Sequence, residues 1–188
     1  MEDREFKIIE EYNVYNSKWL SVSELITLTD GYSQGTYNVV NKNNCVSAVI
    51  ENLENKILFV KSFRFPTREY AWELPMGGIE KNETSDYAVK REVFEEVGIK
   101  PDLYVLQKFH PNPGLTSQSA IVYYGRIGKK ETRMALDYNV KVDEIVDRKF
   151  FNHLEWKKLI QNGLITDGLT MSSLMIYEIL HNIVERRK

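Results

Sequence analysis

The sequence predicts a mixed α/β fold in which mixed or antiparallel sheets are favoured. Strand-type segments dominate the first 126 residues, and helical segments are interspersed among them or come late in the chain. The 188 residues suit one domain, or one domain with a small appendage, and can bury a sizeable core. With 43% hydrophobic and 12% aromatic residues, the composition is globular and excludes an acidic, disordered chain.

Strands are expected where apolar residues alternate, or where short β-branched runs lie between turn signals. In Trp19–Thr29 the alternation predicts a half-exposed strand, and Asp30-Gly31 predicts a hairpin turn into a second extended stretch that ends at Val39–Val40. Further strands are expected at Cys45–Ile50, Ile57–Phe63, Leu103–Phe109, Ser119–Ile127 and Glu144–Phe151. The first two of these are expected to pair as central strands. A polar run at 41–44 predicts a boundary between a small antiparallel β extension, residues 1–42, and a main domain, residues 43–188.

Three segments have helical patterns. Thr84–Val97 has Thr84 or Ser85 as its N-cap and Gly98 as its C-cap. A short helix is expected at Leu154–Gln161, and a longer one at Asp167–Arg187, where Asp167 is the N-cap.

Charge and cysteine content exclude several classes of protein. The 25 basic and 27 acidic residues leave a formal net charge of -2, which excludes a generally basic nucleic-acid binder. Cys45 is the one cysteine and cannot form an internal disulfide, so a reducing cytoplasm is expected. The sequence has neither an apolar run of signal length at its start nor 18 consecutive apolar residues, so no membrane association is expected.

The helix expected at Thr84–Val97 gathers acidic side chains on one face. Glu92, Glu95 and Glu96 fall within an arc of about 100°. Beside this arc runs an apolar stripe made by Val89, Val93 and Val97. Such clusters are usually solvated faces, but like charges this close destabilise a helix unless a cation compensates them. Hard oxygen ligands select Mg²⁺, Mn²⁺ or Ca²⁺. Residues 77–99 have a net charge of -3 and the rest of the chain +1, so the negative balance lies in this segment.

The acidic cluster is part of a longer pattern: Gly, five residues, Glu, seven residues, then Arg-Glu-apolar-x-Glu-Glu-x-Gly-apolar. The positions are filled by Gly77, Glu83, Arg91, Glu92, Val93, Glu95, Glu96, Gly98 and Ile99. A full match by chance in this chain has a probability on the order of 10⁻⁷ at average residue frequencies. The pattern is the signature of the Nudix hydrolases, and the segment resembles that family at every position.

The resemblance implies an αβα sandwich around a mixed sheet, and metal-dependent hydrolysis of a nucleoside diphosphate linked to another moiety. It implies that Glu92, Glu95 and Glu96 are ligands of Mg²⁺, with Mn²⁺ as a possible substitute. The backbone carbonyl of Met76 would complete the metal shell. By the same resemblance, Arg91 orients the glutamates, Gly77 and Gly98 shape the loops, and Glu83 has a structural role.

The flanking sequence resembles ADP-ribose pyrophosphatases and related nucleotide-sugar pyrophosphatases. The residues that carry this likeness are Ile57–Pro66, Trp72-Glu73-Leu74-Pro75-Met76-Gly77-Gly78 and Pro113-Gly114. The likeness implies substrate contacts by Trp19, Arg64, Glu73, Pro113 and Gly114. It also implies a homodimer in which the N-terminal strands are exchanged. Four of these contacts have a structural alternative: Trp19 as core, Arg64 as a surface cation, Pro113 as an ordinary loop proline, and Glu73 as an ion-pair partner of Arg64 or Arg68.

The sequence departs from the subfamily near residues 137–145, where a closely spaced glutamate pair is expected. Asp143 and Glu144 are candidate general bases, but Lys141 stands where an acid is expected, so Glu95 or Glu96 is an alternative base. ADP-ribose is the expected small-molecule substrate, with GDP-mannose or another nucleoside diphosphate sugar as the alternative. Less favoured hypotheses are a dinucleoside polyphosphate hydrolase and a non-catalytic nucleotide-binding module.

Overall fold

The structure is a computed structural model that describes residues 4–139 and 144–185. It divides into two units. The first consists of the chain up to Asn44 together with Asn112–Ser119, and the second consists of Cys45–Pro111 and the chain from Ala120 onward. Each unit is built on a β-sheet of its own.

The first unit is a three-stranded antiparallel sheet made of β1 (Phe6–Asn16), β2 (Leu20–Thr29) and β3 (Ser33–Lys42). Asp30 and Gly31 have φ angles of 52° and 78°, and the backbone N–H of Tyr32 donates to the Thr29 carbonyl at 3.3 Å, so the chain reverses within the three residues between β2 and β3. The predicted hairpin is therefore confirmed. Strand β1 was not predicted, because two register shifts against β2 interrupt its alternation of apolar and polar residues.

The segment Asn112–Ser119 is joined to this sheet by hydrogen bonds along β3. The Tyr37 hydroxyl donates to the carbonyl oxygen of Gly114 at 2.5 Å, and the backbone N–H of Val40 donates to the carbonyl oxygen of Leu115 at 2.9 Å. The first unit therefore contains a second piece of chain, Asn112–Ser119, that lies beyond the predicted boundary near residue 42.

The second unit contains a seven-stranded mixed sheet. Its strands are β4 (Cys45–Glu51), β5 (Ile57–Arg64), β6 (Glu69–Glu73), β7 (Met76–Gly78), β8 (Tyr104–Phe109), β9 (Ala120–Arg126) and β10 (Ile145–Phe151). The main order is β10-β5-β4-β9-β8, with β6 paired to β5 and β7 to β4. Strands β4 and β9 run parallel, and the other pairs are antiparallel.

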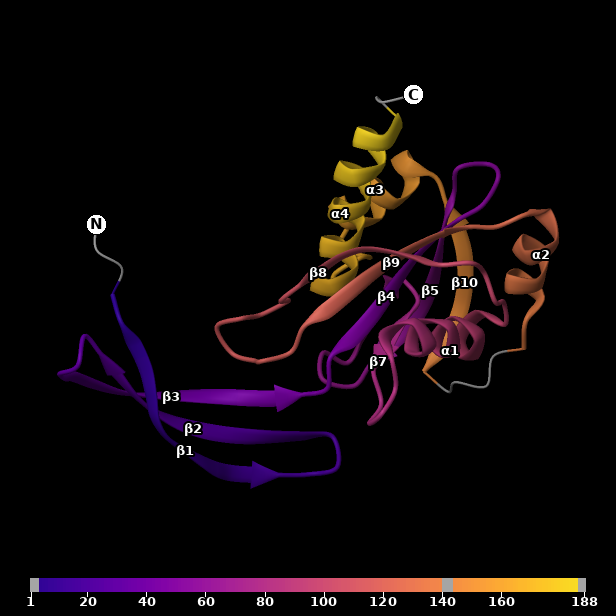
Figure 1. The fold of residues 1–188 in the computed structure, drawn as a ribbon. Coiled ribbons are helices and arrows are strands. Elements are labelled where there is room, and N and C mark those ends of the chain that lie inside the picture. The colour runs from indigo at the N-terminus through magenta and orange to yellow at the C-terminus, as the bar shows by residue number, and fades with distance from the viewer. Residues whose placement is uncertain (1–3, 140–143, 186–188) are drawn as a thin grey trace. The chain divides into compact units, whose positions relative to one another are not determined.

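Helices cover both faces of this sheet. They are α1 (Ser85–Val97), α2 (Lys129–Asp137), α3 (His153–Gln161) and α4 (Gly168–Glu185). Figure 1 shows α1 against one face and α4 against the other. In residues 4–139 and 144–185, no helix is long and apolar enough to cross a membrane. The prediction of a mixed α/β sandwich with a small antiparallel sheet is confirmed.

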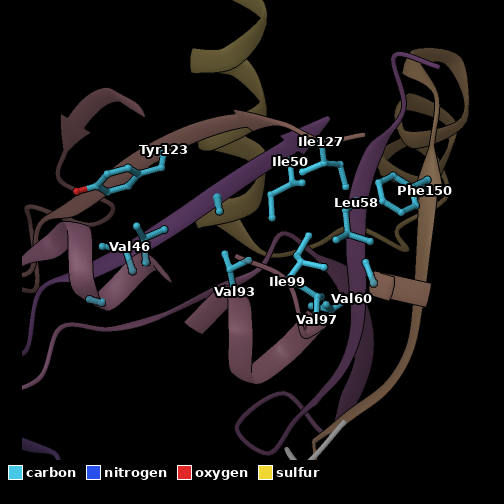
Figure 2. Packing of buried hydrophobic residues seen from close by; sticks show 14 residues of the cluster. Val46, Ile50, Leu58, Val60, Val93, Val97, Ile99, Tyr123, Ile127 and Phe150 are labelled. Atoms are coloured by element: carbon cyan, nitrogen blue, oxygen red, sulfur yellow. The ribbon is translucent and has the colours of Figure 1, made fainter. Parts of the chain in front are cut away.

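Alternate residues of the central strands form the two apolar cores. Val46 and Ile50 of β4 lie in the core under α1, and Val49 between them lies in the core under α3 and α4. Figure 2 shows Val93 and Val97 of α1 pointing into the first core. The predicted valine stripe is therefore the buried face of α1, and the neighbouring face is left for the glutamates.

The ends of α1 are those that the sequence predicts. The Thr84 hydroxyl accepts a hydrogen bond from the backbone N–H of Tyr87 at 3.3 Å. Gly98 ends the helix in the left-handed conformation, with φ of 71°, and its N–H donates to the carbonyl of Phe94. A Cβ at Gly98 would lie 2.3 Å from Cδ2 of Tyr138, so this position must also be small.

Strands β4 and β5 are antiparallel neighbours in the centre of the sheet, as predicted. Their pairing is at Glu51 and Ile57 beside the connecting turn, and β5 also pairs along its length with β6 and β10. Helix α2 was missed because Gly128 at its N-cap offers no capping side chain and Ala135 is its one buried residue.

We expect Gly98→Ala to destabilise the protein more than Gly163→Ala. Gly163 has a similar φ, 67°, but a Cβ there would meet nothing within 4 Å. Gly163→Ala should therefore lose about 1–2 kcal/mol of unfolding free energy from backbone strain. Gly98→Ala should lose a further ~1–3 kcal/mol because the Tyr138 ring must move. Urea unfolding followed by circular dichroism measures both values, and equal losses would contradict the close packing of Tyr138.

Candidate active site

The guanidinium of Arg91 joins the loop before α1 to the acidic face of the helix. Its Nε and Nη2 donate to the two carboxylate oxygens of Glu83 at 2.8 and 3.0 Å. Its Nη1 donates to Glu92 at 2.8 Å and to Glu95 at 3.2 Å, and Nη2 also donates to the carbonyl of Gly78 at 2.9 Å. Arg91 therefore gathers three carboxylates and one backbone oxygen, as its predicted orienting role requires.

Within this network the pKa of Glu83 is lowered, whereas that of Glu92 is raised. The hydrogen bond from Arg91 is the main reason that the pKa of Glu83 is lowered, and the bond with Glu83 likewise raises the pKa of Arg91. For Glu92, burial raises the pKa, and the charge of Arg91 opposes that rise. Glu83 is thus a firmly ionised partner of Arg91, consistent with a structural role.

Glu96 lies apart from Arg91 and is 8% exposed. Its Oε2 accepts a hydrogen bond from the backbone N–H of Met76 at 3.2 Å. Burial raises its pKa well above the ordinary value, and the charge of Glu92 raises it further. A carboxylate in this position holds a proton or needs a cation beside it.

The loop that faces α1 leaves no space for side chains at Gly77. A Cβ added there would lie 2.0 Å from Cδ of Glu92, so a larger residue would displace that carboxylate. Gly77 and Gly78 belong to β7, which pairs with Cys45–Ser47 of β4. Gly77 therefore allows β7 to approach the acidic face of α1 closely.

The donor set fits a hard divalent cation. Carboxylates and a backbone carbonyl are the ligands that Mg²⁺ and Mn²⁺ prefer, and the charge of Glu96 lacks a nearby cation among the salt bridges of the described residues. The residues that would hold the ion are Met76, through its carbonyl, and Glu92, Glu95 and Glu96. As placed in residues 4–139 and 144–185, no three acidic, histidine or cysteine side chains converge into a ready-made ion site.

A second arginine cluster lies at the end of β5. Arg64 Nε donates to both carboxylate oxygens of Glu73 at 3.0 Å, and Arg64 Nη1 lies 3.9 Å from Oε2 of Glu144. Glu73 is 1% exposed, and its burial raises its pKa against the opposing effect of Arg64. The structure thus brings together three predicted site residues, while Asp143 lies outside the described residues.

The other predicted substrate contacts belong to the first unit. Trp19 lies between β1 and β2, is 75% exposed, and has Nζ of Lys18 4.5 Å from its ring centre. The core alternative for Trp19 therefore does not hold in this chain. Pro113 and Gly114 are exposed in the segment that pairs with β3.

Comparison of the sequence with known families decides its membership. Residues 41–164 match the sequence profile of the NUDIX domain. The chain belongs to the NUDIX family. This segment covers most of the second unit, including the whole of the Arg91 network.

Relatives with assigned names fall into two groups. An ADP-ribose pyrophosphatase of Bacillus subtilis (strain 168) is 25% identical over 182 residues, which cover 95% of this chain and 96% of the relative. An RNA pyrophosphohydrolase of Baumannia cicadellinicola subsp. Homalodisca coagulata is 39% identical over 56 residues. That match covers 30% of this chain and 33% of the relative, so the chain spans about a third of the length of the RNA pyrophosphohydrolases that it matches.

A solved structure described as an ADP compounds hydrolase has the same fold. Its TM-score is 0.75, with 16% sequence identity and 93% of each chain covered. The likeness extends beyond the NUDIX segment at residues 41–164, because it covers nearly the whole chain.

The first turn of the NUDIX helix α1 has an anchor that sequence reasoning missed. The hydroxyl of Tyr123, a fully buried residue of β9, donates to Oδ1 of Asp86 at 2.6 Å. Burial, and then this hydrogen bond, raise the pKa of Tyr123 to about 12. No local signal links the two residues, because they lie 37 positions apart.

We expect the contribution of Tyr123 to stability to be lost at high pH. Its pKa of about 12 lies above the ordinary 10.0, so the neutral hydroxyl stabilises the fold below pH 10 and this contribution declines as the pH rises toward 12. Tyr123→Phe should lower the unfolding free energy by roughly 1–2 kcal/mol at pH 8. The difference from wild type should shrink by pH 11 in urea titrations.

Tyr104→Phe on β8 is the matched control, because Tyr104 is exposed. Its unfolding free energy should follow that of wild type at every pH. A difference between Tyr123→Phe and wild type that stays constant from pH 8 to pH 11 would show that Tyr123 does not act through its buried hydroxyl.

Proposed function

We propose that the protein is a Mg²⁺-dependent hydrolase that cleaves the diphosphate bond of a nucleoside diphosphate sugar. The products are a nucleoside monophosphate and a sugar phosphate, and Mn²⁺ is an alternative ion. The observation that carries the proposal is the Arg91 network, which holds Glu92 and Glu95 beside a buried Glu96 that forms no salt bridge within residues 4–139 and 144–185.

Each residue of the site has a separate task in this reaction. The ion is held by three carboxylates and one backbone carbonyl, those of Glu92, Glu95, Glu96 and Met76. Arg91 keeps Glu92 and Glu95 in position. When bound, a divalent ion lowers the pKa of water and neutralises charge on the leaving phosphate. In the reaction, oxygen of water bonds to phosphorus and the bridging P–O bond breaks. Arg64 is exposed enough to contact a phosphate while Glu73 holds it from below.

A carboxylate must take the proton from the attacking water. Glu144 is a candidate because it is exposed and lies near Arg64, and Asp143 is its neighbour in sequence. Glu95, which is about half exposed, is an alternative base on the helix. Glu96 is assigned to the ion instead, because it is 8% exposed and its Oε2 is held by the Met76 N–H.

ADP-ribose is the proposed first substrate. The support comes from the Bacillus subtilis ADP-ribose pyrophosphatase, which aligns with nearly all of this chain, including the first unit. Likeness to RNA pyrophosphohydrolases is limited to about a third of their length and does not carry an RNA substrate. GDP-mannose or another nucleotide sugar is the alternative, and Trp19 is the proposed stacking surface for the base. The buried single thiol of Cys45 supports a reducing, cytoplasmic setting.

We also propose that the protein is a homodimer that pairs through the first unit. Every described side chain of β1 is exposed in the single chain. Six of them are large and apolar: Phe6, Ile8, Ile9, Tyr12, Val14 and Tyr15. A three-stranded sheet with such a strand at its edge needs a cover, and a second copy of this chain would provide it.

Glu96→Gln should abolish turnover without lowering stability. The amide keeps the size of the side chain and can accept the Met76 hydrogen bond, but it removes a carboxyl group whose pKa is raised by burial. Release of monophosphate with Mg²⁺ should fall at least about 10³-fold, because an ion ligand is lost. The unfolding free energy of the metal-free protein should stay the same or rise.

Glu54→Gln is the control for this experiment, since Glu54 lies in an exposed turn. The assay follows ADP-ribose, GDP-mannose, UDP-glucose, ADP-glucose and a 5′-triphosphorylated RNA, with products identified by mass spectrometry. ADP-ribose should give the fastest release of monophosphate. Release from none of the sugars, or an unchanged rate in Glu96→Gln, would overturn the proposal.

Ile8→Lys should convert a dimer of 22.0 kDa chains into a monomer. A charge on the apolar face of β1 cannot be buried against a second copy without a large desolvation cost. Light scattering coupled to size-exclusion chromatography measures the mass. Leu154→Lys, at an exposed position of α3, should leave the dimer intact. A monomeric wild-type protein would show that β1 is covered by something else.

A further inference from the structure

The first turn of α4 contacts the chain that runs from the end of β6 into β7, residues 74–78, which we call the metal loop because it carries the Met76 carbonyl. Thr170 is fully buried there, and its backbone N–H donates to Oδ2 of Asp167 at 2.6 Å. This bond confirms the predicted cap. The Thr170 hydroxyl oxygen accepts a hydrogen bond from the backbone N–H of Leu74 at 3.2 Å, across 96 residues of sequence. Thr170 thus fixes one point of the chain between β6 and β7.

In residues 72–76, the backbone N–H of every second residue is hydrogen-bonded to another part of the second unit. The N–H groups of Trp72, Leu74 and Met76 donate to the Leu164 carbonyl, the Thr170 hydroxyl and the Glu96 carboxylate, at distances of 2.8, 3.2 and 3.2 Å. Three different elements therefore set the path of one short segment. The last of these bonds reaches a proposed ion ligand.

The chain between the bonds at Leu74 and Met76 is one residue long and conformationally restricted. Pro75 separates Leu74 from Met76, so its φ is fixed and the conformation of Leu74 before it is restricted. The Pro75 carbonyl also accepts from the N–H of Ala48 at 2.9 Å. Because this run of chain has so little conformational freedom, the position of Leu74 constrains the position of Met76.

We propose that Thr170 is a positioning residue for the divalent ion, acting through Leu74 on the Met76 carbonyl and on Glu96. The inference rests on the proposed function, since it concerns the ion site of that reaction. Loss of the hydroxyl leaves the Leu74 N–H buried and unpaired, and the segment moves to satisfy it. The ion then meets ligands that are displaced, so its affinity falls.

Helix α4 offers a matched control at Ser173. This side chain is also fully buried, but its hydroxyl has no hydrogen-bond partner among the described residues. Ser173→Ala and Thr170→Val each remove one buried hydroxyl from the same helix. Only the second removes a bond to the metal loop.

The test compares Mn²⁺ binding without substrate, measured from the electron paramagnetic resonance signal of the free ion. Thr170→Val should bind Mn²⁺ about 10-fold more weakly than wild type, as is typical when a group that orients metal ligands is lost. Thr170→Ser keeps the hydroxyl and should restore the affinity, and Ser173→Ala should match wild type. The Mg²⁺ concentration for half-maximal rate should rise in Thr170→Val, while the rate at saturating Mg²⁺ changes less.

A second measurement needs only the wild-type protein. If the Thr170–Leu74 bond favours ion binding, then Mg²⁺ must in turn protect that bond. Amide exchange at Leu74 should slow on adding Mg²⁺ by more than exchange at Ile127, whose N–H donates to Glu51 at the far end of the sheet. This arm decides the matter even where Thr170→Val fails to fold.

The outcomes separate this inference from the proposed function. Equal Mn²⁺ affinity in Thr170→Val and wild type, or equal slowing at Leu74 and Ile127, overturns the positioning role while the hydrolase remains. Weaker Mn²⁺ binding in Thr170→Val, together with no hydrolysis of any sugar nucleotide by wild type, supports the positioning role and overturns the proposed reaction. A wild-type protein that does not bind Mn²⁺ overturns both.

Discussion

The second unit depends on one guanidinium group. Arg91 makes five hydrogen bonds, to Glu83, Glu92, Glu95 and the Gly78 carbonyl, and so connects the loop before α1 with the helix itself. Three carboxylates within one turn or two of a helix repel one another. A planar cation with a fixed fork of donors is the group that can hold them at defined positions. The same side chain therefore fixes the loop before α1, positions the carboxylates on the helix and neutralises part of their charge.

Glu96, unlike Glu92 and Glu95, is not held by Arg91. It lies beside the valine stripe, receives one backbone N–H from Met76, and forms no salt bridge within the described residues. A buried carboxylate without a counter-ion makes the fold less stable than an apolar residue would. Proteins keep such a group where it has a task, and a bound cation would supply the missing charge. Two neighbouring glutamates of one helix, Glu95 and Glu96, thus have different environments.

Much of the fold and of the site could be predicted because the signals are local. The caps and the valine stripe of α1 lie within 15 residues, and the signature places every carboxylate candidate for the ion on that helix. The bond of Thr170 to Leu74 and that of Tyr123 to Asp86 could not be predicted, because they join residues 96 and 37 positions apart through packing of whole elements. Strand β1 was missed because its register shifts remove the regular alternation. The pairing of Arg64 with Glu73 was an open alternative, since either of two arginines could reach that acid.

The first unit is discontinuous in sequence, since the chain leaves it at Asn44, returns at Asn112 and leaves again at Ser119. The returning segment is tied to β3 and its end, for example by the Ser119 N–H, which donates to Oδ1 of Asn44 at 2.9 Å. A protease cut after Asn44 would therefore nick the protein without releasing the N-terminal strands. A shortened gene that begins near residue 43 would express a loop whose hydrogen-bond partners have been deleted. For crystallisation or engineering, a shortened chain must keep residues 6–42 if every strand is to keep its partner.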